Sequence, residues 1–272
     1  MTGRLDGKVA IVTGAGTRLP GIGIGCAIAQ TLARDGATVL IADREQENAE
    51  ATLRLIEDDG GRAEVCLTDV SVEEDCAAMV RTAIDRFGGL DILVNNAGIS
   101  IHAPVTDTSL ELFERIIGVN LRGTFMCCKY AVPELIARGG GSIVNIGSIA
   151  ALRDTGGSHP AYAASKGGVH SMTIDIAGEY GRHNVRVNAV LPGMIQSPIA
   201  ESVGNGPVPM EVQRRLNMLG RMGTVWDIAN AVWMLCLPEA SYITGHILPI
   251  DGGATVAMSP TWTRGDRFEA RQ

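Results

Sequence analysis

The sequence lacks the features that mark nucleic-acid-binding and membrane-spanning proteins. Its 23 basic residues are outnumbered by 30 acidic ones, giving a net charge of −7, so no positive surface field is available to attract a phosphate backbone. No uninterrupted apolar run approaches the roughly 18 residues that a membrane span requires. We therefore expect a soluble protein with neither nucleic acid nor a membrane among its partners.

Patterns that would indicate disulfides, secretion or a metal are also missing. The six cysteines include no C-x-x-C pair, and the N-terminal residues 1–6 show no positively charged segment followed by an apolar stretch, as a secretory signal would. The His, Cys, Asp and Glu residues show no metal-ligand spacing. We expect reduced thiols, a cytoplasmic location and no metal site.

The sequence does contain a regular alternation of short and long apolar patterns. Its 272 residues, 46% of them hydrophobic, can bury one large core, and no repeat or linker divides the chain. Short β-branched runs predict seven strands, at Lys8–Val12, Ala37–Ala42, Ala63–Leu67, Asp91–Val94, Gly141–Ile146, Val185–Val190 and His246–Ile250. Helical periodicity predicts helices over roughly 22–35, 45–59, 72–87, 109–137, 161–181 and 224–236. This order predicts a single α/β domain, a doubly wound seven-stranded parallel sheet with helices on both faces.

A glycine-rich loop, residues 13–23, follows the first strand and precedes a helix. Such a loop lets the backbone approach a pyrophosphate and directs helix N–H groups at its charge. Asp43 ends the second strand, where its carboxylate can bind both hydroxyls of an adenosine ribose and repel a 2′-phosphate. This favours NAD over NADP, although Arg18 or Arg44 could bind such a phosphate. Asp43 could instead cap the following helix.

Tyr162 and Lys166 are spaced i, i+4 on a predicted helix and so share one of its faces. A tyrosine has a pKa near 10, and a neighbouring ammonium favours its ionised form, which is the form that acts as a base. The alternative is an ordinary exposed contact between two helical side chains.

With these motifs in order, the chain resembles the short-chain dehydrogenase/reductase family from Leu5 to about Gly253. Five further matches have the family's order and spacing, namely Asn95–Gly98, Asn120, Ser148, Pro192–Gly193 and Asp251–Gly253. The resemblance implies a Rossmann-type domain over residues 1–253, with a substrate loop at about 194–220 and a C-terminal tail over 254–272.

The resemblance further implies an NAD-dependent oxidoreductase that interconverts a secondary alcohol and a ketone by hydride transfer. Tyr162 would be the general acid/base, and Ser148 would bind the substrate oxygen. Lys166 would bind the nicotinamide ribose and lower the pKa of Tyr162, and Asn120 would hold a water that links Lys166 to solvent. Considered alone, Ser148 could be a strand-end cap and Asn120 a helix residue bonded to a backbone carbonyl.

The cofactor contacts implied by the resemblance are Gly14, Gly21, Ile22, Gly23, Asp43, Asp69, Val70, Asn96, Ala97, Gly98, Tyr162, Lys166, Pro192, Gly193, Ile195 and Ser197. Two positions depart from the family pattern. Ser197 stands where a threonine is usual, and the glycine-rich loop carries three extra residues within Ala15–Pro20. The insertion could bulge outward or fold across the adenosine and bring Arg18 to it.

The substrate pocket implied by the resemblance lies over Tyr162, and its candidate contacts are Ser148, His102, Arg153 and Met194. Arg153 or His102 could bind a carboxylate or a polyol, whereas Met194 favours an apolar group. We expect a homotetramer built through helices 109–137 and 161–181 and the last strand. The alternatives are an NADPH-dependent 3-oxoacyl-thioester or carbonyl reductase and a non-catalytic cofactor-binding regulatory protein.

Overall fold

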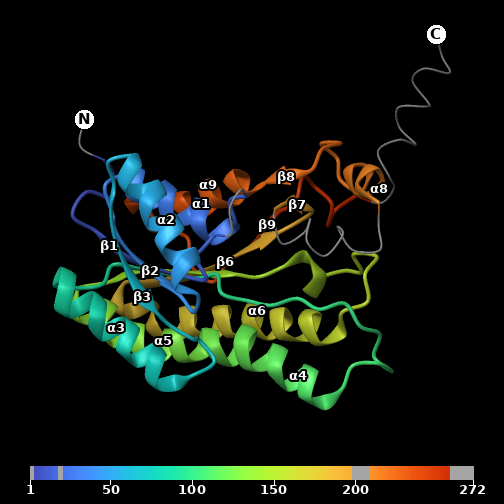
Figure 1. Cartoon of the computed structure of the whole chain (residues 1–272), viewed down its shortest axis with the longest axis horizontal. Coiled ribbons are helices and arrows are strands. Elements are labelled where there is room, and N and C mark those ends of the chain that lie inside the picture. The colour runs from blue at the N-terminus through green and yellow to red at the C-terminus, as the bar shows by residue number, and fades with distance from the viewer. Residues whose placement is uncertain (1–2, 18–20, 198–208, 258–272) are drawn as a thin grey trace, which may run out of the picture.

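A computed structural model describes residues 3–17, 21–197 and 209–257. Its centre is a parallel sheet in the order β3-β2-β1-β4-β5-β6-β9 (Figure 1). The strands are β1 Val9–Thr13, β2 Thr38–Asp43, β3 Arg62–Leu67, β4 Ile92–Asn95, β5 Gly141–Ile146, β6 Val185–Pro192 and β9 Ile247–Ile250. All seven predicted strands are confirmed, and the strand order is that of a doubly wound Rossmann-type sheet.

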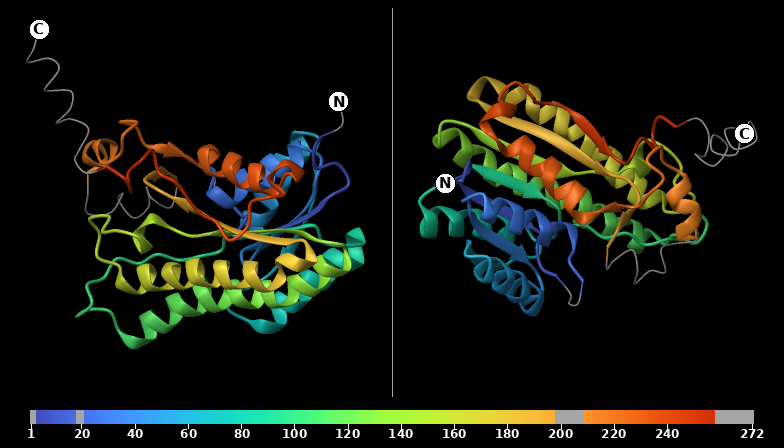
Figure 2. Two further views of the ribbon diagram at one scale, coloured as in Figure 1. Left: turned by 180° about the vertical axis from the view of Figure 1, so that it is seen from behind. Right: turned by 90° about the horizontal axis from the view of Figure 1, so that it is seen from above.

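Helices cover both faces of this sheet, as predicted. One layer holds α1 (Ile24–Arg34), α2 (Gln46–Asp58) and α9 (Val225–Cys236), and the other holds α3 (Glu73–Phe87), α4 (Leu110–Ile117), α5 (Gly123–Ala137) and α6 (Pro160–Tyr180). Figure 2 shows α5 and α6 running side by side along the second face. Short 3-10 turns lie at Ile149–Ala151, Gly181–His183 and Pro238–Ala240.

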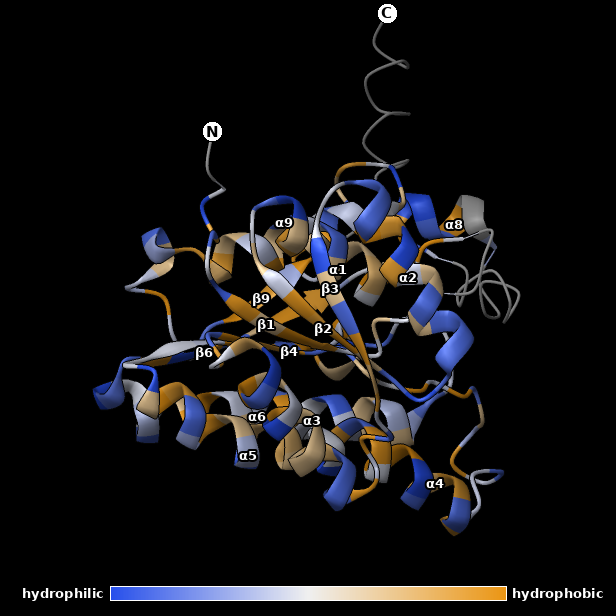
Figure 3. Cartoon of the chain, turned by 60° about the vertical axis from the view of Figure 1, so that its left-hand side comes forward, coloured by the Kyte–Doolittle hydropathy of each residue, from blue (hydrophilic) through white to orange (hydrophobic). Residues whose placement is uncertain are grey.

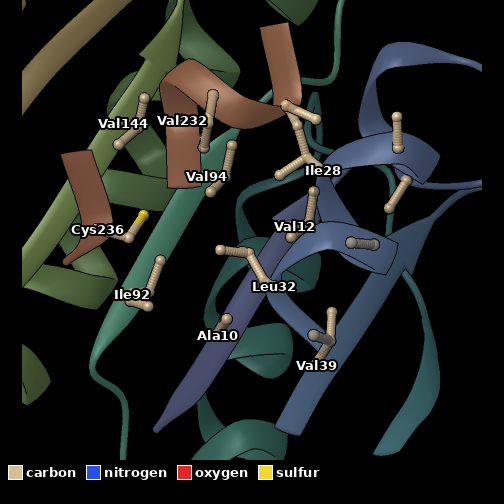
Figure 4. Packing of buried hydrophobic residues seen from close by; sticks show 14 of the residues in the cluster. Ala10, Val12, Ile28, Leu32, Val39, Ile92, Val94, Val144, Val232 and Cys236 are labelled. Carbon is tan, nitrogen blue, oxygen red and sulfur yellow. The ribbon is translucent and has the colours of Figure 1, made fainter. Parts of the chain in front are cut away.

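The core consists of two apolar layers, one on each face of the sheet. In the layer under α1 and α9, Val12 and Val94 of the central strands pack with Ile28 and Val232 of the helices (Figure 4). The central strands such as β1 are mainly apolar, whereas hydrophilic residues lie mostly on the helices and on the edge strand β3 (Figure 3). Near-continuous apolar strands are expected where a parallel sheet is covered on both sides.

A buried polar ladder crosses the second face. Asn145 of β5 accepts a hydrogen bond from Asn95 Nδ2 at 2.9 Å and donates one to Thr173 Oγ1, also at 2.9 Å. These groups join β4, β5 and α6 beside the carboxyl ends of the central strands. Because unpaired buried polar groups are costly, the ladder fixes how these elements meet.

The predicted helix over 109–137 is interrupted by a π-helical turn at Gly118–Arg122, between α4 and α5. The side chain of Asn120 in this turn is fully buried and binds the backbone of Ile99. One extra residue per turn lets this amide face inward without bending the helices away from the sheet. The sequence predicted the helix but not the turn.

Besides the π turn and the 3-10 turns, three short elements were not predicted from the sequence. They are α8 (Met210–Arg215) and the two-stranded sheet of β7 (Ile195–Gln196) and β8 (Gly223–Thr224). The assignment of residues 254–272 to a tail stays a prediction, since positions 258–272 lie outside the described residues, as do 198–208 of the expected substrate loop. Among the described helices, none combines the length and apolarity needed to cross a membrane.

The topology places a crevice between β1 and β4. From β1 the chain proceeds outward to β2 and β3, and from β4 it proceeds the other way to β5, β6 and β9. Loops that leave the carboxyl ends of β1 and β4 therefore diverge to opposite sides, which is where open α/β sheets bind their ligands.

Candidate active site

The glycine-rich loop leaves β1 and lies against the segment that follows β4. Gly14 has a φ of +60°, and a Cβ here would lie 2.7 Å from the Cα of Ala97, so only glycine fits. Asn96 Nδ2 donates to the carbonyls of Thr13 and Gly14, at 3.0 and 2.8 Å. At the start of α1, the N–H of Gly23 donates to Thr17 Oγ1 at 3.2 Å, and Gly23 has no side chain to cap the N–H groups that follow, which suits a helix terminus that binds an anion.

The described part of the insertion docks on the end of β2 and the start of α2. Three hydrogen bonds hold it, from Gly16 N to Asp43 Oδ2 (2.8 Å), from Thr17 N to Asn48 O (3.0 Å) and from Thr52 Oγ1 to Ala15 O (2.8 Å). Residues 15–17 therefore do not bulge away from the fold. Arg18, which was expected to reach a ribose phosphate in one arrangement, lies outside the described residues.

Asp43 serves as the anchor of this insertion. Its Oδ2 accepts from Gly16 N–H, and its Oδ1 accepts from Glu45 N–H at 3.0 Å. Glu45 occupies the N-cap position of α2 but makes no side-chain cap bond, and Asp43 accepts the Glu45 N–H from two residues earlier, so Asp43 caps the start of the helix without being its N-cap residue. Each carboxylate oxygen can accept more than one hydrogen bond, and Asp43 keeps capacity for a ligand hydroxyl.

An open cavity of about 530 Å³ lies beside Asp43 at the ends of β2 and β3, lined by Arg44, Glu45, Leu67, Thr68, Asp69 and Asp75. Asp69 Oδ1 accepts from the hydroxyl of Ser71 at 2.6 Å, which holds the pKa of Asp69 below its ordinary value against the opposing effect of burial. Arg44 Nε lies 3.4 Å from the carboxylate of Glu45. The cavity is therefore lined by three carboxyl groups and one guanidinium.

Three predicted residues meet where α6 crosses the end of β5. Lys166 Nζ lies 5.8 Å from the centre of the Tyr162 ring and donates to the carbonyl of Ile146 at 2.7 Å. The hydroxyl of Ser148 lies near the phenol of Tyr162 and acts to lower its pKa. Because Ser148 follows β5 directly, strand and helix together bring a phenol, a hydroxyl and an ammonium to one point.

Burial shifts both titratable groups of this trio toward their neutral forms. It raises the pKa of Tyr162, with the Ser148 hydroxyl opposing the shift, and it lowers the pKa of Lys166, only 4% exposed, to about 8. In this state Tyr162 is a proton donor. A further positive charge nearby would favour the phenolate and allow Tyr162 to accept a proton.

The structural roles considered for Ser148 and Asn120 are both confirmed. Ser148 Oγ accepts from Ala150 N–H at 3.1 Å and caps the short 3-10 turn after β5. Asn120 Oδ1 accepts from Ile99 N–H, and its Nδ2 donates to the Ile99 carbonyl and to Ser165 Oγ, at 2.8, 2.9 and 3.0 Å. The expected water beside Asn120 stays a prediction.

Two histidines lie at the rim of this site, next to Tyr162. His159 Nδ1 is 3.2 Å from His102 Nδ1, and the rings of His159 and Tyr162 meet edge to face with centres 5.4 Å apart. Burial first, and then His102, lower the pKa of His159. A hydrogen bond between the two Nδ1 atoms requires one of them to donate and the other to accept, so only one of these two atoms carries a proton.

The other two expected substrate contacts lie toward the C-terminal end of the sheet. The guanidinium of Arg153 donates to the carbonyl of Ala254 and so ties the loop after β5 to the segment after β9. Met194 lines a cavity of about 270 Å³ together with Ile195, Arg221 and Asp251. Neither residue has a described contact with Tyr162, so their substrate roles stay predictions.

The remaining predicted cofactor residues follow the carboxyl ends of β1, β3, β4 and β6, which the sheet brings to one edge. Gly193 packs so closely that a Cβ would lie 2.6 Å from the Cα of Asp251. Gly98 lies beside Asn120 and Lys166, and a Cβ there would be 3.3 Å from Asn120 Oδ1. The assembled edge has the composition of a dinucleotide site, in which glycines allow close approach of the backbone.

Two contributors were missed from the sequence. Gly16 binds Asp43 across the insertion, and no spacing rule indicates such a contact between a loop and a strand end. His170 lies under Ser148, and its position could have been found, because it continues the i, i+4 spacing of Tyr162 and Lys166 by one more turn.

Comparisons with known proteins agree with this geometry. A family model described as enoyl-(acyl carrier protein) reductase matches residues 21–255. The uncharacterized oxidoreductase YxbG of Bacillus subtilis (strain 168) is 38% identical over 270 residues, 96% of this chain and 94% of that protein.

Two solved structures extend the comparison. A short-chain dehydrogenase/reductase from Burkholderia xenovorans has a TM-score of 0.90 and 37% identity, covering 94% of this chain and 100% of the other. A 7α-hydroxysteroid dehydrogenase complexed with NADH and 7-oxo glycochenodeoxycholic acid has a TM-score of 0.85 and 36% identity, covering 92% of this chain and 95% of the other.

Proposed function

Because this chain belongs to the short-chain dehydrogenase/reductase family of oxidoreductases, which act on CH–OH groups, we propose that it is an NAD-dependent enzyme that interconverts a secondary alcohol and a ketone. The observation that carries the proposal is the meeting of Tyr162, Ser148 and Lys166 at the end of β5. Tyr162 and Lys166 lie on one helix, so their proximity alone could be a matter of chance. The Ser148 hydroxyl comes from a different element, the segment after β5, and still lies near the phenol of Tyr162.

The residues present fit a nicotinamide dinucleotide. The backbone cradle at Gly14 and the start of α1 would hold the pyrophosphate, Asp43 the adenosine ribose and Asp69 the adenine. Lys166 would bind the nicotinamide ribose. The nicotinamide ring would supply the acceptor for the hydride that leaves the carbinol carbon.

The protein's own side chains manage the proton. In the oxidation direction, Tyr162 Oη takes the proton of the substrate hydroxyl, and the Ser148 hydroxyl donates a hydrogen bond to the same substrate oxygen. Lys166 must be protonated to favour the phenolate, and its lowered pKa places that ammonium close to titration near neutral pH. In the reverse direction Tyr162 returns the proton to the carbonyl oxygen.

The preference for NAD depends on the charge of Asp43. Its carboxylate, fixed by Gly16 and Glu45, would accept the ribose hydroxyls and repel a 2′-phosphate. A likeness to a hydroxysteroid dehydrogenase complexed with NADH supports this preference. Arg44 favours the second candidate, an NADPH-dependent 3-oxoacyl-thioester or carbonyl reductase, because it lines the same cavity, although Glu45 lies beside its guanidinium.

Replacing Asp43 by Asn is expected to reduce the preference for NAD over NADP by about 10- to 100-fold, measured as the ratio of kcat/KM values. The change removes the repulsive charge while the amide oxygen can still accept from Gly16. Asp58→Asn, at the other end of α2, is the matched control and should leave the ratio unchanged. An unaltered ratio in Asp43→Asn would mean that residues of the insertion, and not Asp43, distinguish the ribose of NAD from that of NADP.

The proposed reaction is tested by the change in nicotinamide absorbance with purified protein, either cofactor, and a panel of secondary alcohols, sugars, hydroxy acids and steroids. Turnover with NAD supports the proposal. Turnover only with NADPH and a 3-oxoacyl thioester or other carbonyl compound supports the second candidate. Tight binding of NADH with no turnover across the panel would favour a non-catalytic cofactor-binding regulatory protein.

We further propose that the chain forms a homotetramer in the cytoplasm. Helices α4, α5 and α6 expose Leu110, Phe113, Phe125 and Ile174, which are 78%, 40%, 52% and 55% accessible, and exposed apolar groups on one face favour association. All six cysteines are free thiols, as a reducing compartment requires. Light scattering should give four chain masses, and Phe125→Glu should lower that number; a monomeric wild type contradicts the assembly.

A further inference from the structure

A third titratable residue continues the stripe of Tyr162 and Lys166 on α6. His170 lies one turn beyond Lys166, is 7% exposed, and belongs to a helix face that crosses the end of β5. Each residue of the stripe lies at that strand end: Tyr162 is near the Ser148 hydroxyl, Lys166 donates to the Ile146 carbonyl, and His170 accepts from the Ser148 N–H.

The imidazole of His170 fits closely against the backbone that carries Ser148. Its Nε2 lies 3.4 Å from Ser148 N, and a Cβ added to Gly147 would come within 2.5 Å of the same Nε2. The ring can take this place only because residue 147 is glycine. On the other side, the N–H of Gly147 donates to the carbonyl of Val190 at 2.8 Å. The segment 147–148 is therefore held between β6 and the imidazole.

The hydrogen bond from Ser148 defines the state of the ring. An N–H donor requires a lone pair on Nε2, so the ring is neutral with its proton on Nδ1. Burial, followed by the charge of Lys166, lowers the pKa of His170 to about 4. A protonated ring would lose the bond to Ser148 and would place a second cation beside Lys166.

We propose that His170 is a positioning residue, whose neutral imidazole accepts the Ser148 N–H and fixes the Ser148 hydroxyl where it meets the substrate oxygen. This inference rests on the proposed function, because Ser148 matters to the reaction only if Tyr162 exchanges a proton with substrate. His170 itself touches neither reactant. Its effect should appear in kcat and leave cofactor binding unchanged.

The test compares His170→Leu, which keeps bulk but has no acceptor, with His170→Gln, whose amide oxygen can accept from Ser148. We expect kcat to fall about 10- to 100-fold in the Leu variant and to recover to within about threefold of wild type in the Gln variant. The dissociation constant for NADH should change by less than about twofold in both. His183→Leu, at an exposed position after α6, is the control and should behave as wild type.

A second readout does not need turnover. Exchange of the Ser148 amide with deuterium should be slow in wild type and His170→Gln and faster in His170→Leu. Equal kcat in wild type and Leu, or an equal loss in Leu and Gln, would contradict positioning through an acceptor. If the wild type turns over no substrate, the proposed function fails, but the exchange measurement still tests the hydrogen bond between Ser148 N–H and His170. Equal exchange rates in wild type and His170→Leu would contradict that hydrogen bond.

Discussion

Replacing Tyr162 by Phe is expected to lower kcat by about 1,000-fold, with little change in the affinity for NADH. The substitution removes one oxygen from a half-buried ring and keeps the ring itself beside Ser148 and Lys166. General acid/base groups contribute about 100- to 10,000-fold to turnover. The phenol is proposed to be the only group that exchanges a proton with the substrate oxygen. Its loss should therefore lower kcat and leave the affinity for NADH unchanged.

The measurement is steady-state turnover on the best substrate of the panel, with NADH binding followed by calorimetry. Tyr242→Phe is the matched control, since Tyr242 is fully exposed and distant from the site in the sequence. A Tyr162→Phe variant that keeps more than about a tenth of wild-type kcat would show that another group handles the proton.

Replacing Lys166 by Met should move activity and stability in opposite directions. Turnover is expected to fall about 100- to 1,000-fold, because no ammonium would remain to favour the phenolate of Tyr162. The free energy of unfolding is expected to rise by about 2 kcal/mol at pH 7, because a desolvated charge is replaced by an apolar chain of similar length. The lost hydrogen bond to Ile146 makes this gain smaller than the full cost of burying the charge.

The direction in which the free energy of unfolding changes with pH distinguishes the effect of the buried charge from a change in packing. The pKa of Lys166 is about 8 in the folded protein against an ordinary 10.5, so between these values the unfolded chain binds more protons. Below pH 8 the buried ammonium should lower the wild-type free energy of unfolding by about 3 kcal/mol. Above pH 8 this free energy should rise as the ammonium loses its proton.

Urea unfolding of wild type and Lys166→Met at pH 7 and pH 10 measures the difference. The stability advantage of the Met variant should shrink as the pH rises, since deprotonation relieves the penalty in wild type. An advantage that is constant over this range would mean that packing, and not charge, is responsible. A Met variant as active as wild type would contradict the proposed role of the ammonium.

The seven strands and most helices were predictable because their patterns are local. A β-branched run such as Ala37–Ala42 or a helical period such as 161–181 is set by neighbours in the sequence. Tyr162 and Lys166 were found for the same reason, because their i, i+4 spacing already places both side chains on one face.

What could not be predicted depends on contacts between distant segments. The π turn around Asn120 forms because that amide binds Ile99, and the strands β7 and β8 have two residues each, too few to show a period. The contact of His102 with His159 joins loops 57 residues apart, and their paths depend on the whole sheet. Asp43 was recognised from its place at a strand end, but its bond to Gly16 arises from an insertion with no fixed conformation in the sequence.

The order of strands also has a kinetic consequence. The central pair joins Ala10 of β1 to Ile92 of β4, so a ribosome must release the first three strands and their helices before the middle of the sheet can close. Closing such a long loop opposes early pairing, and sheets rich in distant contacts fold slowly. The crevice between these two strands is therefore expected to form late during synthesis, and the half-made chain would expose the apolar edge of β1 until β4 arrives.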